Sequence, residues 1–253
     1  MDLPIISNNQ IKHFRSLHQH KFRKELQQYL VEGVKNVEEW LEEDADVECV
    51  IAIKEWYATH LHLLGNIPKE KCLVIIEKDL EKLSGFKTPN QVVLVVNMPK
   101  QQSVKIFDDA KWIIMLDTIQ DPGNLGTIIR TADWFGIQDI ICSKGTAEQF
   151  NPKVIQSTMG SLLRVQCHYE NLPDFLEKHS EIPIYAALLD GTPLNGLENF
   201  KPGIILMGNE SNGISDEVKK LVHHRLLIPR LGKAESLNVA VATGIFCNAL
   251  INR

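Results

Sequence analysis

The chain has 253 residues, a formal net charge of −5 at pH 7 and a hydrophobic fraction of 44%. This length suits one large domain or two small ones, and the hydrophobic fraction suits an ordinary globular core. No apolar run approaches the roughly 18 residues of a membrane span, and the N-terminus lacks the charged and then apolar order of a signal peptide. We therefore expect a cytoplasmic protein that does not enter a membrane.

The five cysteines are scattered along the chain and form no Cys-x-x-Cys pair. Scattered cysteines are typical of reduced thiols in a core, and they argue against zinc sites and disulfide frameworks. We therefore expect no metal in this protein.

Residues 1–97 indicate a small mixed α/β domain. Ser7 or Asn8 can cap a first helix, and apolar residues between Val34 and Leu41 recur with the period of a second helix. Three short β-branched runs are typical of buried strands, at 49–53, 73–76 and 92–96. The polar stretch that follows contains Pro99 and predicts a linker at residues 98–109.

A basic stripe lies near the start of this domain, although the whole chain is acidic. Residues 11–24 contain no acid and the following basic residues: Lys12, Arg15, Lys21, Arg23 and Lys24. Such a stripe can bind the phosphates of a nucleic acid. A solvated helix face is the alternative interpretation, and this run alone does not decide between the two.

Residues 110–253 alternate between strand and helix patterns, which predicts a mostly parallel sheet covered by helices. The expected strands are 113–116, 139–142, 162–167, 184–188, 203–207 and 225–228. The expected helices are 124–135, 151–159, 172–179, 215–222 and 236–250. The last of these helices is apolar on almost all sides, so we expect it to be buried.

Three unusual polar segments each follow one of these strands, at 117–132, 206–215 and 228–242. Because ligands of open α/β sheets bind beyond the carboxyl ends of the strands, we expect the three segments to meet at one rim. In the first segment, Pro122-Gly123 suits a type II turn and Asn124 can cap the next helix.

Two further residues of these segments invite a functional interpretation. Arg130 is placed to reach back toward the start of its helix, although a surface ion pair with Asp133 is the alternative. Glu210 stands in a loop where turns favour smaller residues. That loop is neither a dinucleotide fingerprint nor a phosphate-binding loop, which argues against a nicotinamide-dependent oxidoreductase.

The three segments resemble the signature motifs of the SpoU (TrmH) branch of the SPOUT RNA methyltransferases. The matching patterns are Asn-x-Gly-x-x-x-Arg-Thr-Ala at 124–132, Gly-Asn-Glu-x-x-Gly at 208–213, and Ile-Pro-x-x-Gly-x-x-x-Ser-Leu-Asn-Val at 228–239. The stretch Tyr-Leu-Val-Glu-Gly-Val at 29–34 resembles the substrate-binding domain that many SpoU enzymes carry. The resemblance divides the chain into an RNA-binding domain at 1–97 and a catalytic domain at 110–253.

The resemblance implies a fold, a cofactor and a reaction. Members of this family bind S-adenosylmethionine in a deep trefoil knot, methylate a ribose 2'-hydroxyl of RNA and form homodimers through the catalytic domain. The family's methyl-transfer residues fall here on Asn124, Arg130, Glu210, Ser236 and Asn238. The residues expected to bind the cofactor are Leu188, Gly208, Asn209, Ile228 and Leu237.

The resemblance also implies roles and leaves alternatives. Arg130 is expected to grip an RNA phosphate, since a guanidinium stays protonated and makes a poor base. The basic stripe is expected to bind folded RNA through phosphates and shape. An N-terminal domain of this size favours ribosomal RNA as substrate; a tRNA 2'-O-methyltransferase and a non-catalytic RNA-binding or ribosome-assembly protein are the alternatives.

Overall fold

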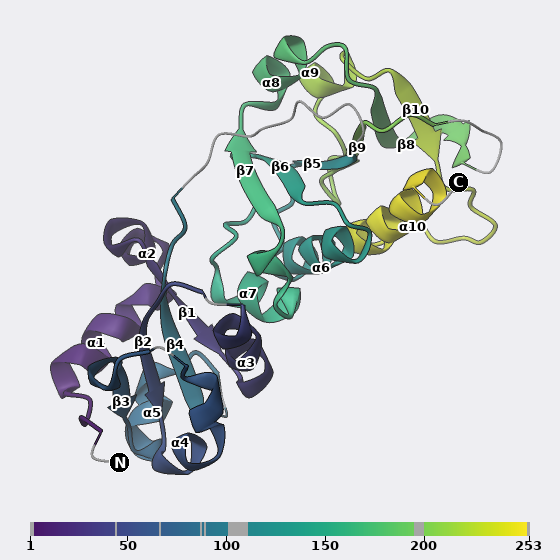
Figure 1. The fold of residues 1–253 in the computed structure, drawn as a ribbon. Helices are drawn as coiled ribbons and strands as arrows, with labels where there is room; N and C mark the ends of the chain where they lie inside the picture. The colour runs from purple at the N-terminus through teal and green to yellow at the C-terminus, as the bar shows by residue number, and fades with distance from the viewer. Residues whose placement is uncertain are drawn as a thin grey trace. The chain divides into compact units, whose positions relative to one another are not determined.

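The computed structural model describes residues 3–43, 45–65, 67–86, 88, 90–100, 111–194 and 200–251. The chain forms two compact units, one of Met1–Gln102 with Phe150–Leu163 and one of Ser103–Gln149 with Arg164–Arg253 (Figure 1). The predicted linker at 98–109 lies mostly outside the described residues. Within the described residues, no helix is both long and apolar enough to cross a membrane.

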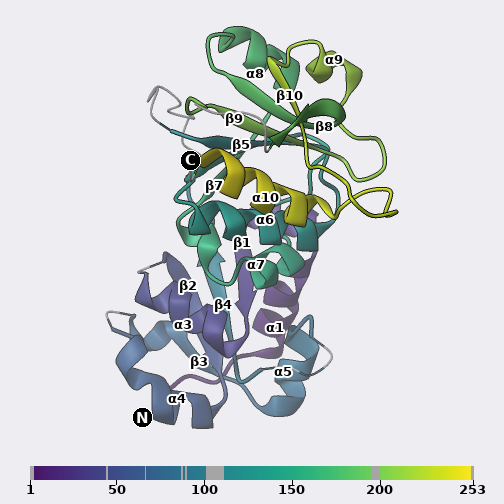
Figure 2. The same ribbon diagram turned by 90° about the vertical axis from the view of Figure 1, so that its right-hand side faces the viewer.

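The first unit is built on a sheet of four strands among its described residues, in the order β1-β4-β2-β3. Its strands are β1 (Gln28–Glu32), β2 (Val47–Ala52), β3 (Cys72–Val74) and β4 (Val92–Asn97). Its helices are α1 (Asn8–Arg15), α2 (His20–Leu26), α3 (Val34–Glu42), α4 (Lys54–His60) and α5 (Glu77–Leu83), with short 3₁₀ turns at Ser16–His18, Leu61–Leu63 and Lys69–Lys71. Figure 2 shows α3 and α4 on one side of this sheet and α1 and α5 on the other.

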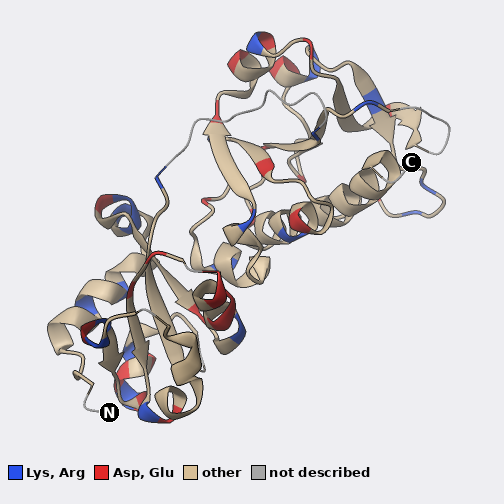
Figure 3. Cartoon of the chain, in the orientation of Figure 1, with Lys and Arg blue, Asp and Glu red and all other residues tan. Residues whose placement is uncertain are grey.

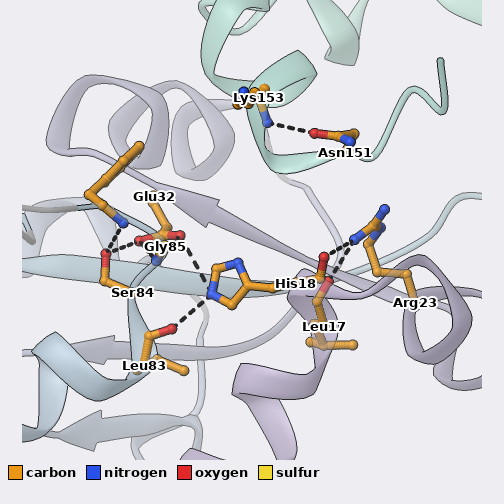
Figure 4. Close-up of polar contacts among 10 residues, drawn as sticks. Leu17, His18, Arg23, Glu32, Leu83, Ser84, Gly85, Asn151 and Lys153 are labelled. Atoms are coloured by element: carbon orange, nitrogen blue, oxygen red, sulfur yellow. Dashed lines mark hydrogen bonds and ion pairs between the residues drawn. The ribbon is translucent and has the colours of Figure 1, made fainter. Parts of the chain in front are cut away.

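The sequence predicted the helices α1 and α3 and the strands β2, β3 and β4, but not the helices α2, α4 and α5. Ser7 and Gln10 form a capping box at the start of α1. The Ser7 hydroxyl oxygen accepts from the Gln10 backbone amide, and the Ser7 backbone amide donates to Oε1 of Gln10. Strand β1 was not predicted as a strand, but it carries the Glu32 of the family stretch at its end. The buried Glu32 carboxylate accepts from the Gly85 amide at 3.1 Å and from the Ser84 hydroxyl (Figure 4). These bonds fasten β1 to the segment after α5.

Residues 150–163 pack in the first unit, although the predicted domain division places them in the catalytic domain. They comprise α7 (Pro152–Thr158) and a 3₁₀ turn at Ser161–Leu163. Ile155 joins the core of the first unit, and Phe150 stacks on Tyr29 with ring centroids 4.7 Å apart. Leu162 and Leu163 pack against the same core, which explains why the strand predicted at 162–167 begins only at 166.

The basic stripe divides into four exposed side chains and one buried one. Lys12, Arg15, Lys21 and Lys24 lie on α1 and α2 and are exposed. Figure 3 marks the Lys and Arg positions along the chain in blue. The prediction that Arg23 contacts RNA is wrong, because its side chain is only 2% exposed. Its Nη1 donates to the carbonyl oxygens of Leu17 and His18, each at 2.9 Å (Figure 4). Arg23 therefore satisfies carbonyls at the turn between the first two helices.

The described residues of the second unit form a sheet of six parallel strands in the order β10-β8-β9-β5-β6-β7. These strands are β5 (Ile113–Asp117), β6 (Asp139–Ser143), β7 (Gln166–Glu170), β8 (Ile184–Pro193), β9 (Ile204–Gly208) and β10 (His224–Leu227). The helices are α6 (Pro122–Trp134), α8 (Leu172–Lys178), α9 (Asp216–Lys219) and α10 (Val239–Ile251). The predicted α/β class with a parallel sheet is confirmed, while the trefoil knot stays a prediction of the family resemblance.

Helices cover both faces of this sheet. Figures 1 and 2 show α8 and α9 on one face and α6 beside α10 on the other. The expectation that the last helix is buried on all sides is wrong in part. Phe246 and Cys247 are buried, but Val241 is 53% exposed and Ile245 is 37% exposed. This helix packs on α6 and the sheet and leaves one apolar stripe uncovered.

The pairing of β8 with β10 opens a space at the edge of the sheet. Arg225 pairs with Ala186, but the next residue, Leu226, pairs with Thr192. The intervening residues 187–191 therefore leave the ladder. Gly191 allows the return, because a Cβ at this position would lie 2.6 Å from the Leu226 amide nitrogen. This detour supplies one wall of the cavity described below.

Candidate active site

Three side chains from distant parts of the chain meet at the carboxyl edge of the six-stranded sheet. Nδ2 of Asn124 donates to Oε1 of Glu210 at 2.6 Å. Nδ2 of Asn238 donates to Oδ1 of Asn124 at 2.8 Å. An ionised carboxylate only accepts hydrogen bonds, so Glu210 requires the amide nitrogen of Asn124 to face it. The oxygen of Asn124 must then face a donor, which Asn238 supplies.

The start of α6 leaves Asn124 free for this role. Helix α6 begins at Pro122, and its cap is Asp121. Oδ1 of Asp121 accepts from the backbone amide of Asn124 at 2.8 Å. The predictions of a type II turn at Pro122-Gly123 and of Asn124 as the cap are therefore wrong. Proline is well suited to the first helical position, so Asp121-Pro122 starts the helix earlier than expected. The Asn124 side chain can consequently join Glu210 to Asn238.

The loop that carries Glu210 is held by its own backbone and by Asn209. The amides of Asn209 and Gly213 each donate to the carbonyl of the other, both at 2.9 Å. Oδ1 of Asn209 accepts from the Ser211 and Asn212 amides, and its Nδ2 donates to the Thr118 carbonyl at 2.8 Å. The polar atoms of this side chain are therefore engaged within the protein. Any cofactor contact of Asn209 is left to its backbone.

The start of α10 supplies the third member of the site. The helix begins at Val239 and not at the predicted residue 236, because Oδ1 of Asn238 accepts from the amides of Ala240 and Val241 at 2.9 and 3.3 Å. Asn238 thus caps α10 with its oxygen and binds Asn124 with its nitrogen. Ser236 lies in the preceding loop, where it is exposed.

A cavity of about 710 Å³ opens beside these residues. Its wall is formed by residues 187–190, 207–214, 225–232 and 234–237, with Lys219, Val239, Ala242 and Phe246. The residues predicted to bind the cofactor all line it: Leu188, Gly208, Asn209, Ile228 and Leu237. Of the predicted catalytic residues, Glu210 and Ser236 line the cavity, whereas Asn124, Arg130 and Asn238 stand outside its wall.

The cavity fits a nucleoside-sized ligand that carries charges. Its volume lies within the range of about 300–1,000 Å³ that is usual for small-molecule sites. Leu188, Ile228 and Leu237 offer an apolar wall for a base, and Glu210 supplies a carboxylate. Gly208 allows its loop to pack tightly in this wall, because a Cβ there would lie 2.4 Å from the carbonyl carbon of Gly213. These features suit S-adenosylmethionine, which combines an adenine with a charged tail.

Arg130 is exposed on α6 and makes no ion pair with Asp133. Asp133 is instead held by Arg164, whose Nη2 and Nε lie 2.9 and 3.1 Å from its Oδ2. Among the described residues, no hydrogen bond or ion pair joins Arg130 to Glu210 or Asn238. The structure therefore leaves this guanidinium open to an external anion, and it does not place it in the hydrogen-bonded group.

Sequence reasoning missed the residues that hold the loop after β5. Thr118 has a left-handed backbone, with φ of 63°, which is strained for a β-branched residue. The Thr118 amide donates to Oγ of Ser143 at 2.8 Å, and the buried Asp117 accepts from the Ser215 amide at 2.8 Å. No local pattern links Ser143 to this loop, because it follows from the pairing of β5 with β6.

A parallel α/β sheet with a nucleoside-sized cavity at its carboxyl edge defines the broad class of cofactor-dependent α/β enzymes. Residues 111–248 match the SpoU rRNA Methylase family, and residues 8–94 match the MRM3-like substrate binding domain. The chain belongs to the SpoU rRNA methylase family.

Two solved structures and one curated relative are similar over nearly the whole chain. The chain is 31% identical over 246 residues to the 23S rRNA (guanosine(2553)-2'-O)-methyltransferase RlmP of Bacillus subtilis (strain 168). This match covers 94% of each of the two chains. A putative RNA methyltransferase of the TrmH family from Porphyromonas gingivalis has a TM-score of 0.84 at 37% identity, over 98% of this chain and 99% of that one. An rRNA methyltransferase from Sinorhizobium meliloti with AdoMet bound has a TM-score of 0.86 at 28% identity, over 98% and 96%.

Replacing Gly208 by alanine should weaken binding of S-adenosylmethionine by about tenfold or more, because the added Cβ forces the wall of the cavity to shift. Isothermal titration calorimetry measures this affinity. Gly232→Ala is the matched control, since Gly232 also lines the cavity but a Cβ there meets no atom within 4 Å. Equal affinities of the two variants would contradict the assigned cavity.

Proposed function

We propose that this protein transfers a methyl group from S-adenosylmethionine to a ribose 2'-hydroxyl of RNA, with ribosomal RNA as the substrate. The observation that carries the proposal is the bonded group of Asn124, Glu210 and Asn238 at the rim of a cofactor-sized cavity. The similarity to RlmP, a 23S rRNA methyltransferase, supports ribosomal RNA as the substrate. The match to a substrate-binding domain at residues 8–94 supports an RNA partner.

The residues of the cavity would hold the cofactor. Leu188, Ile228 and Leu237 would contact its adenine, and Gly208 would line the same side of the cavity. When bound, S-adenosylmethionine supplies a methyl group that is already activated by its sulfonium. The protein's main task is therefore to place the ribose hydroxyl in line with that methyl.

The side chains at the rim would position the RNA. Asn124 and Asn238 are held in fixed orientations, and Glu210 and Ser236 face the cavity. Arg130 would grip the phosphate beside the target ribose through two parallel hydrogen bonds and so polarise the hydroxyl. It would not act as the base, because a guanidinium keeps its proton at neutral pH.

The exposed part of the basic stripe would bind RNA through the first unit. Lys12, Arg15, Lys21 and Lys24 project from α1 and α2 of the first unit. Their charges would contact phosphates of folded RNA, and binding should therefore weaken as salt increases. A cytoplasmic location, where ribosomes are made and used, forms part of this proposal.

The wild-type protein should transfer tritiated methyl groups from S-adenosylmethionine to a 23S rRNA transcript, with the label on a ribose 2'-oxygen. Arg130→Lys should slow single-turnover methylation by about tenfold to 100-fold, because lysine cannot form the bidentate fork. Arg130→Met should lower the single-turnover rate by at least the same factor. If a tRNA transcript were labelled in a parallel assay and the 23S rRNA transcript were not, the proposed substrate would be wrong. No transfer to either RNA would contradict the proposed activity. An Arg130→Lys variant with the wild-type rate would show that the two parallel hydrogen bonds of Arg130 are not needed.

A homodimer would cover the apolar stripe of the second unit. Trp134 on α6 is 85% exposed, and Val241 and Ile245 are exposed on α10, which packs beside it. Exposed apolar patches of this kind mark protein interfaces, and symmetric dimers bury the same patch on both copies. Light scattering should give twice the chain mass of 28.7 kDa. A single chain mass at micromolar concentration would contradict the dimer.

A further inference from the structure

The carboxyl edge of the six-stranded sheet has two halves with different surroundings. The strand order is β10-β8-β9-β5-β6-β7, and the cavity is lined almost wholly by residues in and after β8, β9 and β10. If the proposed function holds, the methyl donor fills this half. The other half, where β5, β6 and β7 end, stays outside the cavity wall and can face the RNA.

The turn at residues 143–146 begins at the last residue of β6 and is hydrogen-bonded to the loop after β5. Oγ of Ser143 accepts from the Thr118 amide at 2.8 Å, and Oγ1 of Thr146 accepts from the Ile119 amide at 3.3 Å. The Ala147 amide donates to the Ile119 carbonyl at 2.8 Å. A Cβ at Gly145 would lie 3.0 Å from Cγ2 of Thr118, so the two segments are in tight contact.

The same hydrogen-bond network extends to Glu210 and Asn124. The carbonyl of Thr118 accepts from Nδ2 of Asn209, and the next residue, Glu210, binds Asn124 at 2.6 Å. A strained residue such as Thr118 keeps its conformation only where its surroundings fix it from several sides. The 143–146 turn therefore belongs to the same rigid frame as Glu210 and Asn124.

Lys144 is the charged residue of this turn, and its side chain is exposed. Within the described part of the chain it makes no hydrogen bond or ion pair. The nearby Asp117 carboxylate is buried and engaged by the Ser215 amide and the Thr118 hydroxyl. An ammonium on a fixed turn, with no carboxylate bound to it, is suited to an anionic ligand.

We propose that Lys144 binds a backbone phosphate of the RNA at the half of the sheet's carboxyl edge where β5, β6 and β7 end. RNA presents phosphates along its whole length, and lysine binds them as a point charge without reading the base. The rigid turn fixes the backbone of Lys144, so binding orders only the side chain. Lys144 is thus a binding residue that aligns the RNA relative to Glu210 and Asn124.

The test is a binding and methylation series on the full-length protein with a 23S rRNA transcript. Lys144→Ala should weaken RNA binding about fivefold at moderate salt and reduce the slope of log affinity against log salt by about one. Lys144→Glu should weaken it further, and Lys144→Arg should restore it. The affinity for S-adenosylmethionine, measured by calorimetry, should stay unchanged in all three variants.

Lys178→Ala is the matched control. Lys178 is also an exposed lysine of the second unit, but it ends α8 near the start of β8, at the opposite edge of the sheet. Its replacement should leave RNA affinity and salt slope unchanged. Wild-type affinity and slope in Lys144→Ala would overturn the inference while leaving the proposed function intact. A wild-type protein that transfers no methyl group to RNA would instead overturn the proposed function and this inference with it.

Discussion

The candidate site depends on a directed series of hydrogen bonds between a carboxylate and the start of a helix. Glu210 accepts from Asn124, Asn124 accepts from Asn238, and Asn238 accepts from the first amides of α10. Each acceptor fixes the orientation of the next amide, because each amide offers its nitrogen on one side and its oxygen on the other. The order of donors therefore runs from the helix to the carboxylate without a choice of direction.

This series explains how three loops of the second unit keep one arrangement. Two of its three members are amides, which do not change charge near neutral pH. Their contribution is therefore orientation and not proton transfer. Two further bonds hold the same loops: Nδ2 of Asn209 donates to the Thr118 carbonyl, and the Ser215 amide donates to Oδ2 of Asp117. The glycines at 191 and 208 let backbone segments of the cavity wall approach one another where no side chain fits.

Much of the fold could be predicted, because β-branched runs and alternating patterns reflect local burial. The strands β5, β6, β9 and β10 lie within one or two residues of their predicted bounds. The prediction was wrong where two local signals compete. Asp121 and Asn124 can both cap α6, and the proline between them favours Asp121. Arg23 looks like a surface cation in the sequence. In the structure it is buried, because its guanidinium donates to the carbonyls of Leu17 and His18 in the preceding turn.

The site could be predicted only as far as its motifs reach. Asn124, Glu210 and Asn238 stand in motifs that resemble a known family, whereas the contact of Ser143 with Thr118 depends on strand order. The packing of residues 150–163 in the first unit likewise depends on tertiary contacts that no periodicity contains. Long-range pairing of this kind is decided by the whole fold and not by the local sequence.

The most direct test of the account is the single-turnover rate of methyl transfer by Asn124→Ala at saturating S-adenosylmethionine, measured beside the affinity for that cofactor. Removing the Asn124 amide breaks both bonds of the series but leaves the wall of the cavity intact. The account predicts a rate lower by about 100-fold with cofactor affinity nearly unchanged. A rate close to that of the wild-type protein would contradict it.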